Sequence, residues 1–179
     1  MEHHIISRET AYSARAFKIE RVHMSLPDGR QTVYDLVAHP GAVTIVPVDA
    51  EGNVYFVRQY RLGAEQVLLE LPAGTRAPNE TPEACANREI REETGMAAGK
   101  LTPVGDFYMA PGYSSEHMFV YLATELSHAP LAQDDDEFIA VETIPFTKVM
   151  EMARQNQIND GKSLASLLLA EPYVKYDRK

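Results

Sequence analysis

Apolar and polar residues alternate in two short segments near the start of the chain. Positions 16–24 and 31–37 show the two-residue period of strands, and a Pro-Asp-Gly turn at 27–29 separates them. We therefore expect a β-hairpin over residues 16–38. Residues 1–12 are polar without a clear pattern, and we expect them to form an irregular end.

Longer apolar runs follow and predict the centre of a sheet. Residues 42–48 are apolar almost without interruption, and residues 54–60 form a second such segment after a turn at 49–53. Runs of this kind are typical of strands that are covered on both faces. Further strands are predicted at 66–71, 101–109, 118–126 and 138–145, and helices at 81–95, 147–156 and 160–170. This order of elements predicts an α+β fold in which helices cover a mixed sheet.

The last two predicted helices are indicated by their first residues and their apolar spacing. Thr147 and Asp160 are suitable caps, because a side-chain oxygen at that position accepts a backbone N–H of the first turn. In the last helix, Leu164, Leu167 and Leu168 recur at helical spacing, so we expect all three to pack in the core.

The helix predicted at 81–95 has the clearest boundaries and the most unusual chemistry. Thr81 followed by proline is a start signal, and Gly95 is a stop signal. Glu89, Glu92 and Glu93 stand at i, i+3 and i+4, so their side chains leave one face of the helix. Carboxylate oxygens in such a group are the ligands that Mg²⁺ prefers. The alternative is a solvated face on which neighbouring arginines balance the glutamates through local ion pairs.

Composition narrows the possible functions. A chain of 179 residues is long enough for one domain with a buried core, and its formal charge of −9 argues against a general nucleic-acid surface. An anionic substrate would be repelled unless metal ions bridged it to the protein. The single cysteine, Cys85, the absence of a long apolar run and the absence of a signal-peptide pattern predict a cytoplasmic protein that does not enter membranes.

A longer pattern surrounds the glutamate-rich helix. Gly74 is followed after five residues by Glu80, and Glu80 after seven more by the segment Arg-Glu-Ile-Arg-Glu-Glu-Thr-Gly-Met at 88–96. The chain thus resembles the Nudix hydrolase family at every defining position of its sequence box. The resemblance implies an α/β/α sandwich and a loop–helix–loop that holds Mg²⁺ or Mn²⁺ and cleaves a nucleoside diphosphate linked to another group. It divides the chain into an N-terminal β-hairpin for dimerisation at 1–39 and a Nudix hydrolase domain at 40–179.

The resemblance also implies roles for the residues of the box. Glu89 and Glu93 would be the principal metal ligands, with the carbonyl group of Ala73 as a further ligand. Glu92 would be an additional or water-mediated ligand that also takes part in catalysis. We expect Arg88 to orient the carboxylates, and Glu80 to pair with a basic residue rather than touch the metal.

Features outside the box resemble the ADP-ribose pyrophosphatases of this family. Pro111 stands 15 residues after Met96, and the strings Val-Arg-Gln-Tyr-Arg at 57–61 and Leu-Glu-Leu-Pro-Ala-Gly at 69–74 match as well. The substrate-binding residues implied are Arg61, Glu70, Gly112 and Glu116. The general base implied is Glu137, with Asp135 and Asp136 as alternatives in the same acidic segment.

The resemblance implies a homodimer with an exchanged N-terminal segment and a nucleotide-sugar substrate. The expected activity is Mg²⁺-dependent cleavage of ADP-ribose or a related nucleoside diphosphate sugar into a nucleoside monophosphate and a sugar phosphate. Two alternatives stay open. One is a broad nucleotide-sugar hydrolase, for example for GDP-mannose, and the other is a non-catalytic domain that senses a nucleotide sugar. The complete set of glutamates argues against the second.

Overall fold

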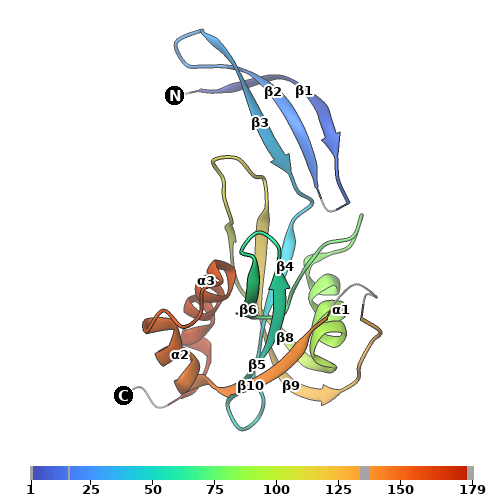
Figure 1. Cartoon of the computed structure of the whole chain (residues 1–179), viewed down its shortest axis with the longest axis vertical. Coiled ribbons are helices and arrows are strands. Elements are labelled where there is room, and N and C mark those ends of the chain that lie inside the picture. Colours follow the sequence, from blue (N-terminus) through green and yellow to red (C-terminus); the bar gives the residue numbers. More distant parts are fainter. Residues whose placement is uncertain (1, 16, 134–137, 177–179) are drawn as a thin grey trace. The chain divides into compact units, whose positions relative to one another are not determined.

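The computed structural model describes residues 2–15, 17–133 and 138–176 (Figure 1). It contains two compact units, which are described separately. Unit 1 consists of Met1–Gly41 with Phe107–His117, and unit 2 consists of Ala42–Asp106 with Met118–Lys179.

Unit 1 contains a three-stranded antiparallel sheet in the order β1-β2-β3. Its strands are β1 (His4–Ser13), β2 (Lys18–Ser25) and β3 (Gln31–Ala38). The β2–β3 hairpin confirms the predicted one, but the expectation that residues 1–12 are irregular was wrong. Pairing with β2 shifts register between Ile5 and Ser7 and again between Thr10 and Tyr12. These irregularities interrupt the two-residue period, and every residue of β1 is exposed, so no burial pattern marks the strand in the sequence.

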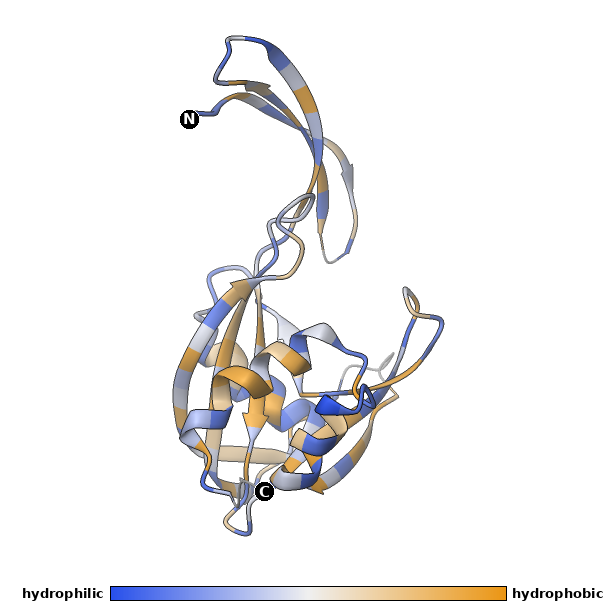
Figure 2. Ribbon diagram, turned by 90° about the vertical axis from the view of Figure 1, so that its left-hand side faces the viewer, coloured by the Kyte–Doolittle hydropathy of each residue, from blue (hydrophilic) through white to orange (hydrophobic). Residues whose placement is uncertain are grey.

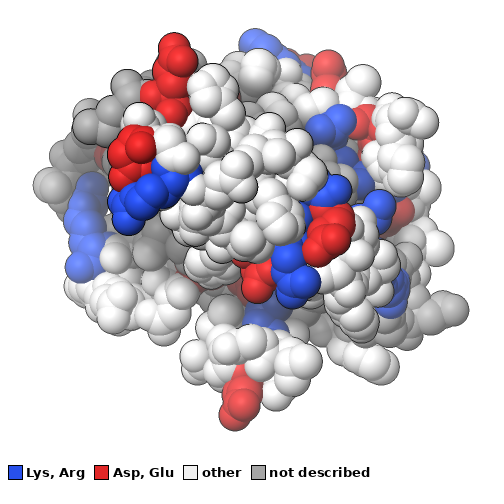
Figure 3. Space-filling model, turned by 90° about the horizontal axis from the view of Figure 1, so that it is seen from above, with Lys and Arg blue, Asp and Glu red and all other residues white. Residues whose placement is uncertain are grey.

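The surface of this sheet carries both ion pairs and exposed apolar side chains. Arg8 on β1 bonds Glu20 on β2 at 2.9 Å, a cross-strand pair of opposite charge. Ile5, Tyr12 and Tyr34 are each more than half exposed, at 51%, 63% and 52%. Figure 2 shows hydrophobic and hydrophilic positions mixed along the strands. On the face shown in Figure 3, Lys and Arg side chains mostly lie beside Asp and Glu side chains.

The segment Phe107–His117 is tied to the end of β3 within unit 1. The N–H of Val37 donates to the carbonyl of Tyr113 at 2.8 Å, and the N–H of Ser115 donates to the carbonyl of Val37 at 2.9 Å. The rings of Tyr108 and His117 stack with their centroids 4.6 Å apart. This segment therefore has a defined shape, and it carries Gly112 and Glu116.

Unit 2 is built on two sheets. The first has the order β7-β4-β9-β8, and the second, which is antiparallel, has the order β10-β5-β6. Their strands are β4 (Ala42–Pro47), β5 (Asn53–Arg61), β6 (Gln66–Glu70), β7 (Ala73–Thr75), β8 (Met96–Tyr108), β9 (His117–His128) and β10 (Ala140–Pro145). Since β4 pairs with β9 in parallel and with β7 in antiparallel orientation, the predicted mixed sheet is confirmed.

Helices cover the strands of unit 2 from two sides (Figure 1). They are α1 (Pro82–Thr94) on one side and α2 (Phe146–Arg154) and α3 (Gly161–Ala170) on the other, followed by the short 3₁₀ helix η1 (Glu171–Tyr173). Strand β4 contributes to two hydrophobic cores. Val43 and Ile45 pack against residues of α1, while Val46 packs in the core that contains residues of α2 and α3. This explains the almost continuous apolar sequence of β4 and confirms the α+β sandwich.

Two details of the C-terminal helices differ from the prediction. Helix α2 begins at Phe146 with Pro145 at the cap position, so Thr147 does not cap it. Phe146 is 1% exposed, and its burial places the helix start before the threonine. Leu168 is 67% exposed while Leu167 is buried, because the next residue lies about 100° further around a helix. None of the helices in the described ranges is long and apolar enough to cross a membrane.

Candidate active site

Helix α1 begins and ends where its sequence predicts. The Thr81 side chain accepts the N–H of Ala84 at 3.2 Å, and Pro82 occupies the first turn. Gly95 closes the helix in the left-handed region at a φ of 73°, where a side chain would be strained. These caps fix which residues of α1 face the sheet.

Two glutamates lie on the buried stripe of α1. The buried residues of this helix are Cys85, Ala86, Glu89, Ile90 and Glu93. Glu89 is 8% exposed and Glu93 is 3% exposed. Burial removes water from their carboxylates, a desolvation cost that an apolar side chain at the same position would not have. A carboxylate is kept in such a position only where charged or hydrogen-bonding partners compensate for the lost water.

Both glutamates turn toward the backbone of β7. Oε2 of Glu93 accepts the N–H of Ala73 at 3.0 Å. The carboxyl group of Glu89 lies over Gly74, where a Cβ atom would come within 1.9 Å of its Cδ. The helix and the preceding glycine loop are therefore fitted to each other, with carboxylate groups at the contact.

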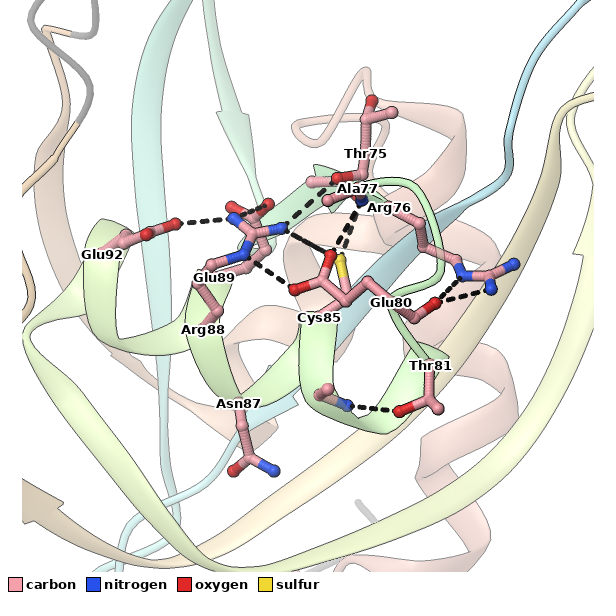
Figure 4. Close-up of polar contacts among 12 residues, drawn as sticks. Thr75, Arg76, Ala77, Glu80, Thr81, Cys85, Asn87, Arg88, Glu89 and Glu92 are labelled. Carbon is pink, nitrogen blue, oxygen red and sulfur yellow. Dashed lines mark hydrogen bonds and ion pairs between the residues drawn. The ribbon is translucent and has the colours of Figure 1, made fainter.

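Arg88 links three carboxylates of this region, as Figure 4 shows. Its Nε and Nη2 donate to the two carboxylate oxygens of Glu80 at 2.9 and 3.0 Å. Its Nη1 donates to Glu89 at 2.6 Å and to Glu92 at 2.8 Å. Glu80 thus pairs with a basic residue, as expected, and Arg88 brings Glu89 and Glu92 together.

The donor set fits a hard divalent cation in its chemistry. Three carboxylates and the backbone of Ala73 offer the oxygen ligands that Mg²⁺ and Mn²⁺ prefer. A positive group already lies between Glu89 and Glu92, namely the guanidinium of Arg88. Within the described residues, however, no three acidic, histidine or cysteine side chains are arranged to enclose a metal ion. Instead, the N–H of Ala73 and the guanidinium of Arg88 hold the carboxylates of Glu93, Glu89 and Glu92.

The Arg88–Glu80 pair leads to a prediction about stability and pH. The hydrogen bonds from Arg88 lower the pKa of Glu80 from 4.5 to about 2. Since the pKa is lowered in the folded state, the pair stabilises the fold above pH 4.5, and this contribution is lost as the pH falls toward 2. We expect Glu80→Gln to lower the free energy of unfolding by about 1 kcal/mol at pH 7, with a smaller difference at pH 3.

Urea unfolding at pH 7, 5 and 3 measures this difference. Glu51→Gln is the matched control, because Glu51 lies exposed in the turn between β4 and β5, and its curves should follow the wild type. If the difference in unfolding free energy between Glu80→Gln and the wild type is as large at pH 3 as at pH 7, the Arg88–Glu80 pair is not its source.

Arg61 and Glu70 form a second group in unit 2. Nε and Nη2 of Arg61 donate to the two oxygens of Glu70, both at 2.8 Å. Lys162 on α3 bonds the same carboxylate, and it also bonds Asp160 at 2.9 Å. The sequence predicted Arg61 and Glu70 as site residues but gave no prediction for Lys162, whose one visible signal is that it is the single charged residue of α3.

An open hollow of about 420 Å³ adjoins the C-terminal end of α1. It is lined by Arg91, Glu92, Glu93, Thr94, Gly95, Pro130, Leu131, Gln133 and Val141. The lining thus includes two carboxylates, one guanidinium and several apolar side chains.

The remaining predicted site residues are Gly112, Glu116 and Glu137. Gly112 and Glu116 belong to unit 1, where the N–H of Glu116 donates to the hydroxyl of Ser114 at 3.1 Å. Glu137 and its alternatives Asp135 and Asp136 lie outside the described residues. The structure thus collects Ala73, Glu89, Glu92 and Glu93 at one place and pairs Arg61 with Glu70.

A glycine loop followed by a helix that turns buried glutamates back onto it brings together carboxylate oxygens of the kind that metal-assisted hydrolases use to hold divalent cations. The NUDIX domain model matches residues 38–167, which is most of the chain. An ADP-ribose pyrophosphatase of Bacillus subtilis (strain 168) is 34% identical over 91% of this chain and 89% of its own. A GDP-mannose pyrophosphatase of Salmonella arizonae is 32% identical over 77% of this chain and 75% of its own. Among solved structures, an ADP compounds hydrolase is similar with a TM-score of 0.84 and 28% identity, covering 97% of this chain and 94% of the other. The chain belongs to the Nudix family and is a pyrophosphohydrolase of that family.

Proposed function

We propose that this protein uses Mg²⁺ to hydrolyse the pyrophosphate bond of ADP-ribose or a related nucleoside diphosphate sugar. The products are a nucleoside monophosphate and a sugar phosphate. The observation that carries the proposal is the placement of Glu89 and Glu93 on the packing stripe of α1, turned toward the loop at Ala73 and Gly74. Relatives named for ADP-ribose and GDP-mannose hydrolysis support the substrate class.

In this proposal the carboxylates of Glu89, Glu92 and Glu93 and the carbonyl of Ala73 hold the metal. Mn²⁺ is a possible substitute, because it accepts the same oxygen ligands. The bound ion supplies charge neutralisation on the phosphates and activation of the attacking water. Arg88 keeps Glu89 and Glu92 close together in the absence of the ion.

Arg61 binds the substrate phosphates in this proposal, and Glu70 orients Arg61. A guanidinium is suited to this task, since it stays charged and its planar N–H groups match phosphate oxygens. Gly112 and Glu116 contribute to substrate binding from the Phe107–His117 segment. Glu137 serves as the general base that takes the proton from water.

Hydrolysis of a substrate panel tests the proposed function. The purified protein with Mg²⁺ is given ADP-ribose, ADP-glucose, GDP-mannose and nucleoside triphosphates, and the products are separated by chromatography. We expect AMP from ADP-ribose with the highest kcat/KM. Triphosphates as the best substrates would overturn the assignment to nucleoside diphosphate sugars.

A second candidate is a hydrolase of broader range that includes GDP-mannose. The 32% identical GDP-mannose pyrophosphatase favours it. The same panel separates the two, because a broad enzyme gives similar kcat/KM values for ADP-ribose and GDP-mannose. The intact glutamates of α1 argue against a domain that only senses a nucleotide sugar.

We also propose that the protein is a homodimer that uses its N-terminal segment, residues 1–39, for the contact between subunits. A small sheet with exposed Ile5, Tyr12 and Tyr34 gains stability when a second surface covers it. Light scattering should give about twice the chain mass of 20.0 kDa, and a monomer at working concentration would contradict the proposal.

A further inference from the structure

A compact group of four charged side chains lies where β6 meets the first turn of α3. Its members are Arg61, Glu70, Asp160 and Lys162. The side chain of Glu70 is 1% exposed and that of Lys162 is 11% exposed. Two carboxylates and two cations balance in charge, which is the condition for keeping such groups away from water.

Arg61 is held along one edge of its guanidinium. Its Nε and Nη2 bond the two oxygens of Glu70, and this pairing leaves Nη1 outside the pair. The Arg61 side chain is 39% exposed, so part of it remains open to a ligand. A guanidinium fixed along one edge presents its outer side in a defined direction, which suits recognition of phosphate.

Lys162 holds Glu70 from the interior. Its Nζ bonds Oε2 of Glu70 and also Oδ2 of Asp160. Burial pushes the pKa of Glu70 upward, but Arg61 and Lys162 outweigh this effect, so the pKa is lowered and the group stays ionised. Glu70 is therefore fixed by two cations, one open to solvent and one buried.

Asp160 and Ser163 anchor this arrangement to the backbone. The carboxylate of Asp160 caps α3 by accepting the N–H of Ser163 at 3.0 Å. The hydroxyl of Ser163 accepts the N–H of Leu71 at 2.7 Å. The first turn of α3 thus contacts two successive residues, Glu70 and Leu71, just before Ala73, whose N–H bonds Glu93.

Lys162, like Glu89 and Glu93 on α1, is a charged residue on the buried side of its helix. It lies on the buried stripe of α3 with Ser163, Ser166, Leu167 and Ala170. An apolar side chain of similar volume at such a position often gives equal or higher stability than a buried ion pair. The charge of Glu93 also acts on Arg61, whose pKa is raised chiefly by the hydrogen bonds to Glu70. Arg61, and with it the group of four charged side chains, therefore interacts electrostatically with Glu93 of α1.

We propose that Lys162 is a positioning residue for substrate binding, which holds Glu70 in place so that Arg61 presents its outer edge to the diphosphate of the substrate. This inference rests on the proposed function, in which Arg61 binds the phosphates. Lys162 contacts neither substrate nor metal and acts through Glu70. When Arg61 engages a phosphate, Lys162 keeps the charge of Glu70 compensated.

A double-mutant cycle of Lys162→Met and Glu70→Gln tests the proposal. The substrate is the nucleotide sugar that the wild type cleaves best. We expect each single variant to raise KM about tenfold while kcat changes less than about twofold, because the effect falls on orientation of a binding group. The double variant should have the KM of Glu70→Gln alone, since Lys162 has no effect once Glu70 carries no charge.

Three comparisons make the outcome decisive. KM effects that multiply in the double variant to about a hundredfold would overturn the proposal, because Lys162 would then act independently of Glu70. Lys162→Arg restores the charge and should recover most of the lost affinity. Lys148→Met is the matched control, since Lys148 pairs with Glu151 on the half-exposed surface of α2 and should keep wild-type KM. If Lys162→Met does not fold, the double variant still serves, because it removes the charge of the buried Glu70 together with its buried cation, and it is compared with Glu70→Gln.

A crystal structure of the Lys162→Met protein separates this inference from the proposed function. We expect Arg61 and Glu70 to lose their two-bond pairing in it. An unchanged pair would overturn the positioning role of Lys162, whatever the substrate. If the wild type cleaves no nucleotide sugar, the proposed function fails, and the crystal structure still decides whether Lys162 positions Arg61.

Discussion

Glu93→Gln is expected to reduce kcat for nucleotide-sugar hydrolysis on the order of 1,000-fold. Loss of a metal ligand removes several kcal/mol of stabilisation of the transition state, and each 1.4 kcal/mol corresponds to about a tenfold change in rate. Glutamine has the same shape, and its carbonyl oxygen can still accept the N–H of Ala73 that Glu93 accepts at 3.0 Å. The fold should therefore persist while the charge is lost.

Steady-state kinetics with Mg²⁺ measure this effect, and a melting curve checks that the variant is folded. The matched control is Glu83→Gln, which removes one carboxylate from the exposed face of the same helix. It should keep kcat within about twofold of the wild type. Turnover by Glu93→Gln at the level of the control would refute the role of Glu93 as a metal ligand.

Gly74→Ala is expected to impair metal binding with little loss of stability. The added Cβ would lie 1.9 Å from Cδ of Glu89, so the carboxyl group must leave its position. Gly74 is not among the glycines with positive φ, so alanine fits the backbone there without strain. The carboxyl group of a glutamate can move by rotation of its side chain. The substitution should therefore reduce metal affinity much more than the free energy of unfolding. We expect a 10- to 100-fold loss of metal affinity, the range found when groups that orient metal ligands are changed.

Calorimetric titration with Mn²⁺ measures the affinity, and Gly63→Ala is the control. A Cβ at Gly63 meets nothing within 4 Å, so this variant should bind metal as the wild type does. Wild-type metal affinity in folded Gly74→Ala would show that the position of Glu89 over Gly74 does not matter for metal binding.

Local sequence signals explain why the ends of α1 could be predicted. Thr81, Pro82 and Gly95 specify the ends of α1 through their own hydrogen bonding and backbone preferences. Once the ends are known, the positions of Glu89 and Glu93 on one face follow from helical spacing. The central strands were predictable for another reason: β4 is buried on both sides, and its sequence is apolar except for Thr44.

The parts that were missed depend on contacts between distant segments. Strand β1 is held by its pairing with β2 and by ion pairs rather than by burial, so its sequence lacks a clear pattern. Lys162 and Glu70 are 92 positions apart, and their contact arises only when α3 packs against the end of β6. The sequence of α3 marks Lys162 as unusual but does not indicate its partner.

The metal requirement of nucleotide-sugar cleavage tests the central claim most directly. The wild-type protein is incubated with ADP-ribose after removal of metal by a chelator, and again after Mg²⁺ is restored, while the products are followed by phosphorus NMR. We expect no cleavage without metal, and AMP with a sugar phosphate in equal amounts once Mg²⁺ is present. Cleavage that continues undiminished in the chelator would show that the glutamates of α1 do not act through a metal ion, and no cleavage of ADP-ribose with Mg²⁺ would contradict the proposed activity on this substrate.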